Sequence, residues 1–212
     1  KPQESKSETA WLSALETGHI SQGWGSPGID KSVEGNPLAI GGRKFSKGIG
    51  SHAPAEIHIN LEGDAERFTA WVGVDEEQGA LAGKGSVEFV VIADDRQVWK
   101  SAVLKGGDAA AQVDVDLRGV KRLALKITDG GDGNSYDHAD WADARIRFSG
   151  KRPQMTPPYY APVSIRDDFS TNTLTDLKRY AQYYNNWEIR KGVLAAHYKP
   201  GQLSALHIMP GW

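Results

Sequence analysis

The chain has 212 residues, of which 39% are hydrophobic and 25% charged, with a formal net charge of −2 and no cysteine. This composition excludes disorder throughout, a disulfide framework, a thiolate metal site and a cysteine nucleophile. The small net charge, without a block of Lys and Arg, disfavours nucleic-acid binding, and no apolar run approaches the length of a membrane span. Residues 1–8 are polar, so we expect that any signal peptide lies outside this segment.

Alternating apolar residues predict β-strands over the first two thirds of the chain. The alternation is clear in residues 57–61, 68–74, 113–117, 123–127 and 144–148, and residues 87–92 are nearly all apolar, as in a central strand. Such segments occur about every ten residues, with no convincing helical stretch between them, which is typical of an antiparallel sandwich. We therefore predict an all-β, jelly-roll-like β-sandwich over residues 9–149.

The composition changes after residue 149. Pro153, Pro157, Pro158 and Pro162 fall close together and predict an extended linker over residues 150–164. Residues 165–212 contain a predicted hairpin that turns at Lys191-Gly192. A β domain this short is marginal alone, so we expect an incomplete second β segment and a chain that is a fragment of a longer protein.

A dense polar cluster lies between the last two predicted strands of the sandwich. It comprises Asp129, Asp132, Asn134, Asp137, His138, Asp140, Trp141 and Asp143, and glycines at 130, 131 and 133 let the backbone fold tightly. A functional loop on a β scaffold is one interpretation. The other is a hydrogen-bonded loop that closes the sandwich, with Trp141 packed beneath it. The loop alone leaves both open.

Three further features of the sequence could indicate a particular chemistry. The segment 48–53 matches a dinucleotide fingerprint, but Pro54 and an alternating strand follow it instead of a helix, so we reject nucleotide binding. Residues 129–140 fail the EF-hand spacing, although calcium ligands can come from separate loops. The acidic residues 75–77, or Asp137 with Asp140, could supply the acid and base of a glycosidase, so a catalytic domain remains an alternative.

Several motifs occur together in one order across residues 9–149. They include Gly23-Trp24-Gly25, Asp30-Lys31-Ser32, Gly35-Asn36-Pro37-Leu38, Lys47-Gly48-Ile49-Gly50-Ser51-His52-Ala53, Val72-Gly73-Val74-Asp75 and residues 129–144. With these motifs the chain resembles the NPCBM family, grouped as carbohydrate-binding module family 51. The resemblance implies a non-catalytic, galactose-binding-like β-sandwich with a structural calcium, attached to secreted glycoside-active enzymes. Residues 165–212 resemble, more weakly, the opening of a concanavalin-like (laminin-G-like) sandwich.

The predicted ligand-binding residues are His52, Asp75, Glu76, His138 and Trp141. An aromatic ring can stack on the C–H face of a sugar, while charged groups and imidazoles bind its hydroxyls. Asp75 could instead tie a loop, and Trp141 could belong to the core. We expect Trp24 to be a core residue rather than a ligand-binding one.

Asp30 and Asp143 are the predicted calcium ligands. Asp30 lies in an early glycine-rich loop and Asp143 just before the last strand of the sandwich, and the first and last strands are often neighbours. Two carboxylates held together repel each other unless a cation lies between them, and calcium takes six to eight oxygen ligands. The alternative is that Asp143 caps a backbone turn and Asp30 is solvated.

We therefore expect a carbohydrate-binding module that targets a larger, secreted or cell-envelope bacterial protein to glycans, most of all galactose-type ones. Its expected partners are a glycan and other domains of the same polypeptide, and neither nucleic acid nor a membrane. The alternatives are a glycosidase or lyase domain, and a protein–protein interaction module of a large surface protein.

Overall fold

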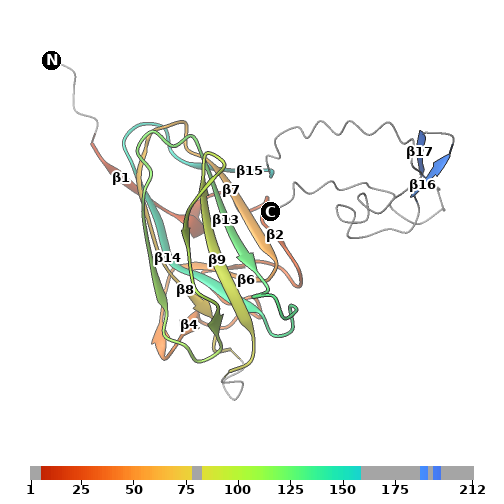
Figure 1. Cartoon of the computed structure of the whole chain (residues 1–212). Helices are drawn as coiled ribbons and strands as arrows, with labels where there is room; N and C mark the ends of the chain where they lie inside the picture. Colours follow the sequence, from red (N-terminus) through yellow and green to blue (C-terminus); the bar gives the residue numbers. More distant parts are fainter. Residues whose placement is uncertain (1–5, 78–82, 159–186, 191–192, 197–212) are drawn as a thin grey trace. The chain divides into compact units, whose positions relative to one another are not determined.

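The computed structural model describes residues 6–77 and 83–158, together with the backbone of residues 187–190 and 193–196. The chain divides into two units between residues 159 and 160 (Figure 1). In the described part of the chain, no helix is both long and apolar enough to cross a membrane.

The first unit is built on two antiparallel sheets. One sheet has the strand order β12–β8–β14–β6–β3, with β1 paired to β14. Its strands are β1 (Glu8–Trp11), β3 (Gly28–Ile29), β6 (Gly48–His52), β8 (Ala65–Val74), β12 (Ala111–Asp116) and β14 (His138–Phe148). The first and last of these strands are therefore neighbours, as expected for a sandwich.

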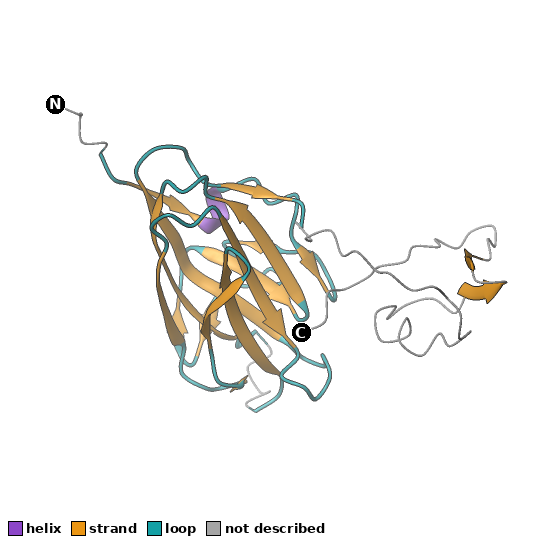
Figure 2. Ribbon diagram, turned by 45° about the horizontal axis from the view of Figure 1, so that its top comes forward, coloured by secondary structure: helices purple, strands orange, loops and turns teal. Residues whose placement is uncertain are grey.

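The other sheet has the order β10–β9–β13–β7–β15, with β11 paired to β9 and β2 to β7. Its strands are β2 (Ser21–Gln22), β7 (Ala55–Asn60), β9 (Ser86–Ala93), β10 (Arg96–Lys100), β11 (Leu104–Lys105), β13 (Arg122–Thr128) and β15 (Gln154–Thr156). A short hairpin of β4 (Ala39–Ile40) and β5 (Arg43–Lys44) and the 3-10 helix η1 (Leu12–Ala14) complete the unit. Figure 2 shows the two sheets face to face, which confirms the predicted all-β jelly-roll sandwich.

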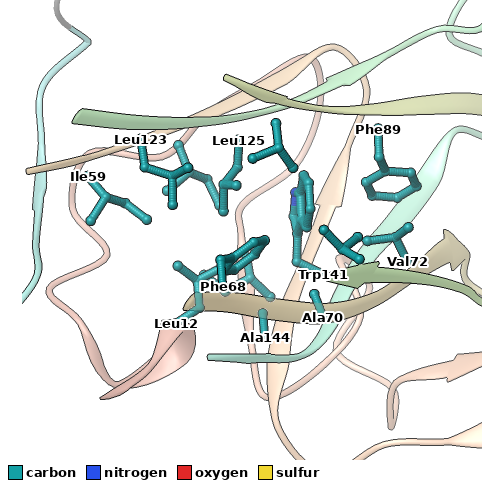
Figure 3. Close-up of a cluster of buried hydrophobic side chains, with 14 of the residues drawn as sticks. Leu12, Ile59, Phe68, Ala70, Val72, Phe89, Leu123, Leu125, Trp141 and Ala144 are labelled. Atoms are coloured by element: carbon teal, nitrogen blue, oxygen red, sulfur yellow. The ribbon is translucent and has the colours of Figure 1, made fainter. Parts of the chain in front are cut away.

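The core fills the space between the sheets and centres on Trp141 of β14. This indole is fully buried and meets the ring of Phe89 edge to face at 5.0 Å and that of Phe68 at 5.9 Å (Figure 3). Alternating residues of β7, including Ile57 and Ile59, point into the same cluster. The period-two pattern of the sequence is thus the burial pattern of the structure.

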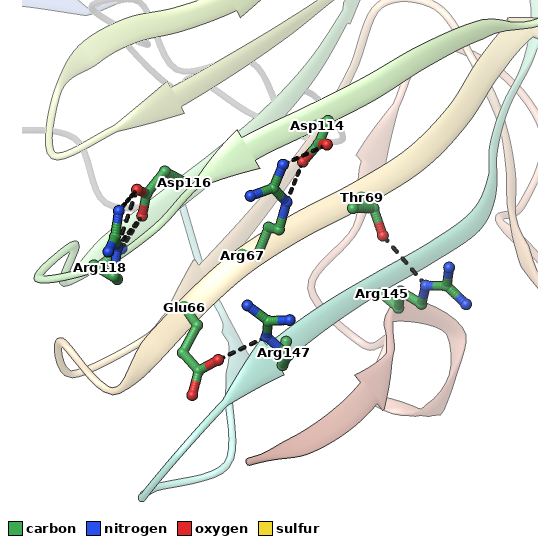
Figure 4. A network of polar contacts seen from close by, with 8 residues as sticks. All are labelled: Glu66, Arg67, Thr69, Asp114, Asp116, Arg118, Arg145 and Arg147. Carbon is green, nitrogen blue, oxygen red and sulfur yellow. Dashed lines mark hydrogen bonds and ion pairs between the residues drawn. The ribbon is translucent and has the colours of Figure 1, made fainter.

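The outer face of the first sheet is solvated and carries charge pairs (Figure 4). Arg67 and Arg147 lie directly opposite each other on β8 and β14, where like charges repel. Each is paired with a carboxylate: Arg67 Nε lies 2.5 Å from Asp114, and Arg147 Nε lies 2.6 Å from Glu66. Because these side chains are exposed, each pair adds little to stability, but its opposite charge offsets the repulsion between the two guanidinium groups.

The sandwich extends beyond residue 149, where we expected a linker to begin. Strand β15 pairs with β7, with Met155 opposite Ile59, and the Met155 side chain is buried in the core. Residues 154–156 are therefore part of a sheet, which corrects the predicted extent of the linker. Its residues from 159 onward lie outside the described residues.

The second unit is described by one antiparallel pair, β16 (Trp187–Arg190) and β17 (Val193–Ala196). Arg190 lies opposite Val193, which agrees with the predicted hairpin, although Lys191 and Gly192 themselves lie outside the described residues. The likeness to a concanavalin-like sandwich stays a prediction.

Candidate binding site

Two histidines lie side by side at one end of the sandwich. His52 is the last residue of β6 and His138 the first of β14, and the two are direct partners in the antiparallel register. Their ring centroids are 5.3 Å apart. Both were predicted as ligand-binding residues, and the structure brings them together, with the sheet itself setting their spacing.

The indole of Trp24 covers this histidine pair on the surface. Its ring stacks on His138 at 5.8 Å and an interplanar angle of 28°, and lies 5.6 Å from the ring of His52. The residue is 54% exposed, so the prediction that Trp24 belongs to the core is wrong. Gly23 allows this placement, because a Cβ at that position would lie 2.5 Å from the carbonyl oxygen of Ala53.

These three rings form one wall of an open hollow of about 540 Å³. Its other lining residues are Gly23, Glu34, Asn134, Ser135 and Tyr136. Tyr136 is 49% exposed and has a left-handed backbone with φ of 66°. Aromatic faces beside amide, hydroxyl and imidazole groups are the combination that a sugar requires.

His138 is held as a hydrogen-bond donor by Glu77. Its Nδ1–H donates to a carboxylate oxygen of Glu77, and this bond raises the pKa of His138 against the opposing effect of burial. Burial alone would raise the pKa of Glu77, but hydrogen bonds from His138, Ser32 and Asn36 lower it. The contact thus favours an imidazolium paired with a carboxylate, the form in which the Nε2–H of His138 can donate to a ligand.

His52 has the opposite character. Its Nδ1 lies 2.7 Å from the carbonyl oxygen of Ala53, and since a carbonyl accepts, Nδ1 carries the hydrogen. Burial lowers the pKa of His52, and the charge of His138 lowers it further, which outweighs the bond to Ala53. Neutral His52 thus offers Nε2 as an acceptor beside the donor of His138, and a sugar hydroxyl both donates and accepts.

Behind the histidines lies a buried pair of carboxyl groups, Asp75 and Asp140. The Asp75 oxygens accept the N–H groups of Ala39 at 3.0 Å and Glu77 at 2.7 Å. Burial raises the pKa of Asp75. Burial also raises the pKa of Asp140, which is fully buried, and the neighbouring Asp75 raises it further. Two like charges held close in a buried place repel each other, which favours the protonated form of Asp140. Asp75 therefore fixes the loop that carries Glu77.

The remaining predicted ligand residues do not line the hollow. Glu76 accepts the N–H of Gly42 at 2.7 Å and so anchors the β4–β5 hairpin. Asp75 ties a loop, which is the alternative left open for it. Trp141 is a core residue, because its indole is fully buried, so the prediction that it contacts a ligand is wrong. Trp24 and Tyr136 line the hollow instead, and the flanking glycines of Trp24 were the available signal. Glu77 acts through its bond to His138.

The carboxyl groups that could have served as a glycosidase acid and base are mostly buried in the sandwich. Asp137 and Asp140 are both 0% exposed and Asp75 is 7% exposed. The Asp137 Oδ1 accepts the N–H of Ser86 at 2.8 Å. A glycosidase acid and base must flank the scissile bond of a bound sugar, which these buried groups do not do.

The two predicted calcium ligands lie on neighbouring backbone segments, and the carboxylate of Asp30 is paired with Lys47. Asp30 and Asp143 flank the start of β6, where the Asp143 N–H donates to the carbonyl of Lys47 at 2.8 Å. The Asp30 carboxylate lies 2.7 Å from the Lys47 ammonium and accepts the N–H of Gly48 at 3.1 Å. Burial raises the pKa of Asp30, but the bonds from Lys47 and Gly48 lower it overall. A calcium ion bound to Asp30 would have to displace the Lys47 ammonium, and calcium at Asp30 and Asp143 stays a prediction.

The fold and the aromatic hollow define a non-catalytic carbohydrate-binding module. The model of the family described as NPCBM/NEW2 domain matches residues 8–147, and the chain belongs to this family. Two solved structures from Clostridium perfringens are similar. A CBM51 of GH95 in complex with methyl-galactose is 36% identical with a TM-score of 0.60, covering 66% of this chain and 99% of that one. The CBM51-2 of ZmpB, in complex with GlcNAc and with INT domains, is 34% identical with a TM-score of 0.61, covering 67% and 32%.

Two curated relatives are much longer than this chain. "Alpha-1,3-galactosidase B" of Akkermansia muciniphila is 36% identical over 135 residues, which are 62% of this chain and 16% of that protein. A protein of Renibacterium salmoninarum is 31% identical over 173 residues, which are 79% of this chain and 10% of the relative.

Proposed function

We propose that the hollow of Trp24, His52 and His138 binds a terminal galactose-type sugar. The observation that carries this proposal is the exposed indole stacked beside a donor and an acceptor imidazole. The axial 4-hydroxyl of galactose leaves C–H groups together on one face of its ring, and this apolar face can lie on the indole. The 4-hydroxyl then donates to Nε2 of His52 and accepts from Nε2–H of His138.

The relatives support a sugar as the ligand. The 36% identical module was solved with methyl-galactose, which supports a galactose-type sugar, whereas the 34% identical one was solved with GlcNAc, whose 4-hydroxyl is equatorial as in glucose. The hollow is open and a monosaccharide makes few contacts there, so the dissociation constant is expected near ~10⁻⁴–10⁻³ M.

In the intact protein, the module carries a glycan-active enzyme to its substrate. The curated relatives, of which this chain matches 10% and 16%, support a place within a much larger polypeptide. The parent protein is secreted or lies in the cell envelope, where complex glycans are met. Detection of the parent protein in the medium or envelope fraction of its host, and not in the cytosol, checks this part.

Calorimetric titration with galactose and with glucose, its 4-epimer, tests the proposed ligand. Galactose should bind and glucose should bind at least about tenfold more weakly, because one misplaced hydroxyl leaves the histidine pair unmatched. Trp24→Ala and His138→Ala should abolish binding, while His19→Ala, at an exposed position outside the hollow, should not change it. Silence on a broad glycan array, with tight binding to a neighbouring domain, would favour the protein–protein alternative instead.

A further inference from the structure

A second hollow adjoins the first across the loop of residues 132–136. It has a volume of about 170 Å³ and is lined by Gly83, Gly85, Ser86, Lys105, Asp132, Gly133 and Ser135. Ser135 lines both hollows. The two hollows are therefore neighbours, with Ser135 between them.

The loop between the hollows is fixed in place by its contacts. The Ser86 hydroxyl donates to Asp132 at 2.5 Å, and the N–H of Gly131 donates to Asp129 at 3.1 Å. The carbonyl of Tyr136 packs where a side chain of Gly85 would otherwise stand and accepts the N–H of His138 at 2.8 Å. The wall between the hollows is thus formed before any ligand arrives.

Tyr136 stands at this wall in a conformation that carries a cost. A residue other than glycine at φ of 66° is strained by about 1–3 kcal/mol, and an aromatic ring that is 49% exposed gains little from burial. The ammonium of Lys84 lies 4.7 Å from the ring centroid, which orients the ring. Residues with strain of this kind cluster at ligand-binding sites.

The chemistry of the second hollow differs from that of the first. Its side chains offer the ammonium of Lys105 as a donor, the Asp132 carboxylate and the Ser86 oxygen as acceptors, and the hydroxyl of Ser135 as either, and its other lining residues are glycines. One positive and one negative group leave no net charge, so the hollow does not select an anion. Donors and acceptors without an aromatic face suit an uncharged, hydroxyl-rich unit rather than an apolar one.

We infer that the binding site extends over residues 132–136 into the second hollow, which holds a second, uncharged sugar unit linked to the terminal one. The module then recognises the end of an oligosaccharide, and the linkage between the two units decides whether the second unit reaches Lys105. This inference rests on the proposed function of the first hollow and adds to it the length and linkage of the glycan.

The full chain should be titrated with methyl galactoside and with a set of galactose-terminated disaccharides that differ in linkage. At least one disaccharide should bind about tenfold or more tightly than methyl galactoside. Lys105→Ala should remove most of that gain and leave the affinity for methyl galactoside unchanged. Lys44→Ala, at an exposed position outside both hollows, is the matched control.

Three outcomes separate the inference from the proposed function. If methyl galactoside binds but every disaccharide in the set binds within twofold of it, the inference is wrong and the proposed function stands. Equal losses for both ligands in Lys105→Ala overturn it as well. If Trp24→Ala leaves sugar binding intact, or if the wild type binds none of these sugars, both the inference and the proposed function are wrong. Amide shifts of Gly133 and Ser135 in NMR spectra, caused by the disaccharide and not by methyl galactoside, give a readout that does not depend on variants.

Discussion

The two tryptophans whose roles the structure exchanges should respond to truncation in opposite ways. Trp141 is fully buried against Phe68 and Phe89, and its indole N–H finds no hydrogen-bond partner among the described residues. Trp141→Ala therefore removes packing alone, at a cost of about 3–5 kcal/mol in the free energy of unfolding. A loss of this size lowers the melting temperature of such a domain by roughly 6–20 °C.

Trp24→Ala should leave the melting temperature nearly unchanged, because the side chain is 54% exposed and such changes usually stay within about 0.5 kcal/mol. It should abolish galactose binding. The assay is thermal unfolding followed by circular dichroism, with galactose titrations of both variants at a temperature where each is folded. Trp141→Phe, which keeps a ring in the core, should recover part of the stability. The reasoning is refuted if Trp141→Ala melts like the wild type and binds no sugar, or if Trp24→Ala melts as early as Trp141→Ala does.

Three further outcomes are expected. The affinity for galactose should be highest at a pH between the pKa values of His52 and His138. It should weaken as pH rises through the raised pKa of His138 and as pH falls through the lowered pKa of His52. NMR titration of both imidazoles alongside affinity measurements checks this, and an affinity that does not change with pH contradicts it. Asp140→Asn should flatten the loss of stability with rising pH. A carboxyl group whose folded-state pKa is raised contributes stability at low pH that is lost as pH rises through that pKa, and equal shifts in melting temperature at pH 5 and pH 8 would count against the raised pKa of Asp140. The melting temperature should be higher in millimolar calcium than in EDTA, and Asp143→Ala should remove this difference. If EDTA leaves the melting temperature of the wild type unchanged and elemental analysis finds no metal, calcium does not bind.

The sandwich could be predicted because the alternation of apolar and polar residues in its strands shows which side chains are buried. The alternation of Ile57, Ile59 and Leu61 with polar residues is the observed burial pattern of β7 and the residue after it. Strand β15 could not be predicted in the same way. It has three residues, one of them buried, and prolines surround it. Proline is tolerated beside an edge strand, and only the pairing with β7 makes this segment a strand.

The site was predicted in part, for a reason that lies in β14. Its first five residues are all buried, so the alternation that separates core from surface is hidden there. Asp140 is buried near Asp75, which is far away in sequence, and no local pattern records such a neighbour. The polar residues around Trp141 therefore predict a loop there instead of a core strand. His52 and His138 were found because a polar loop and a strand end were each recognisable locally.

The pairing of His52 with His138 across β6 and β14 separates the fixed part of the site from its variable part. A slip of one residue in β14 would turn His138 inward and expel Trp141 from the core, since neighbouring side chains of a strand face opposite ways. A change that shifts the register of β14 and separates the two imidazoles would therefore also disrupt the core. Trp24 and residues 134–136 lie outside the strands and carry no such constraint. A library that randomises these positions should keep the fold while it yields modules with new sugar preferences, so this family can diversify its ligands at little cost to its scaffold.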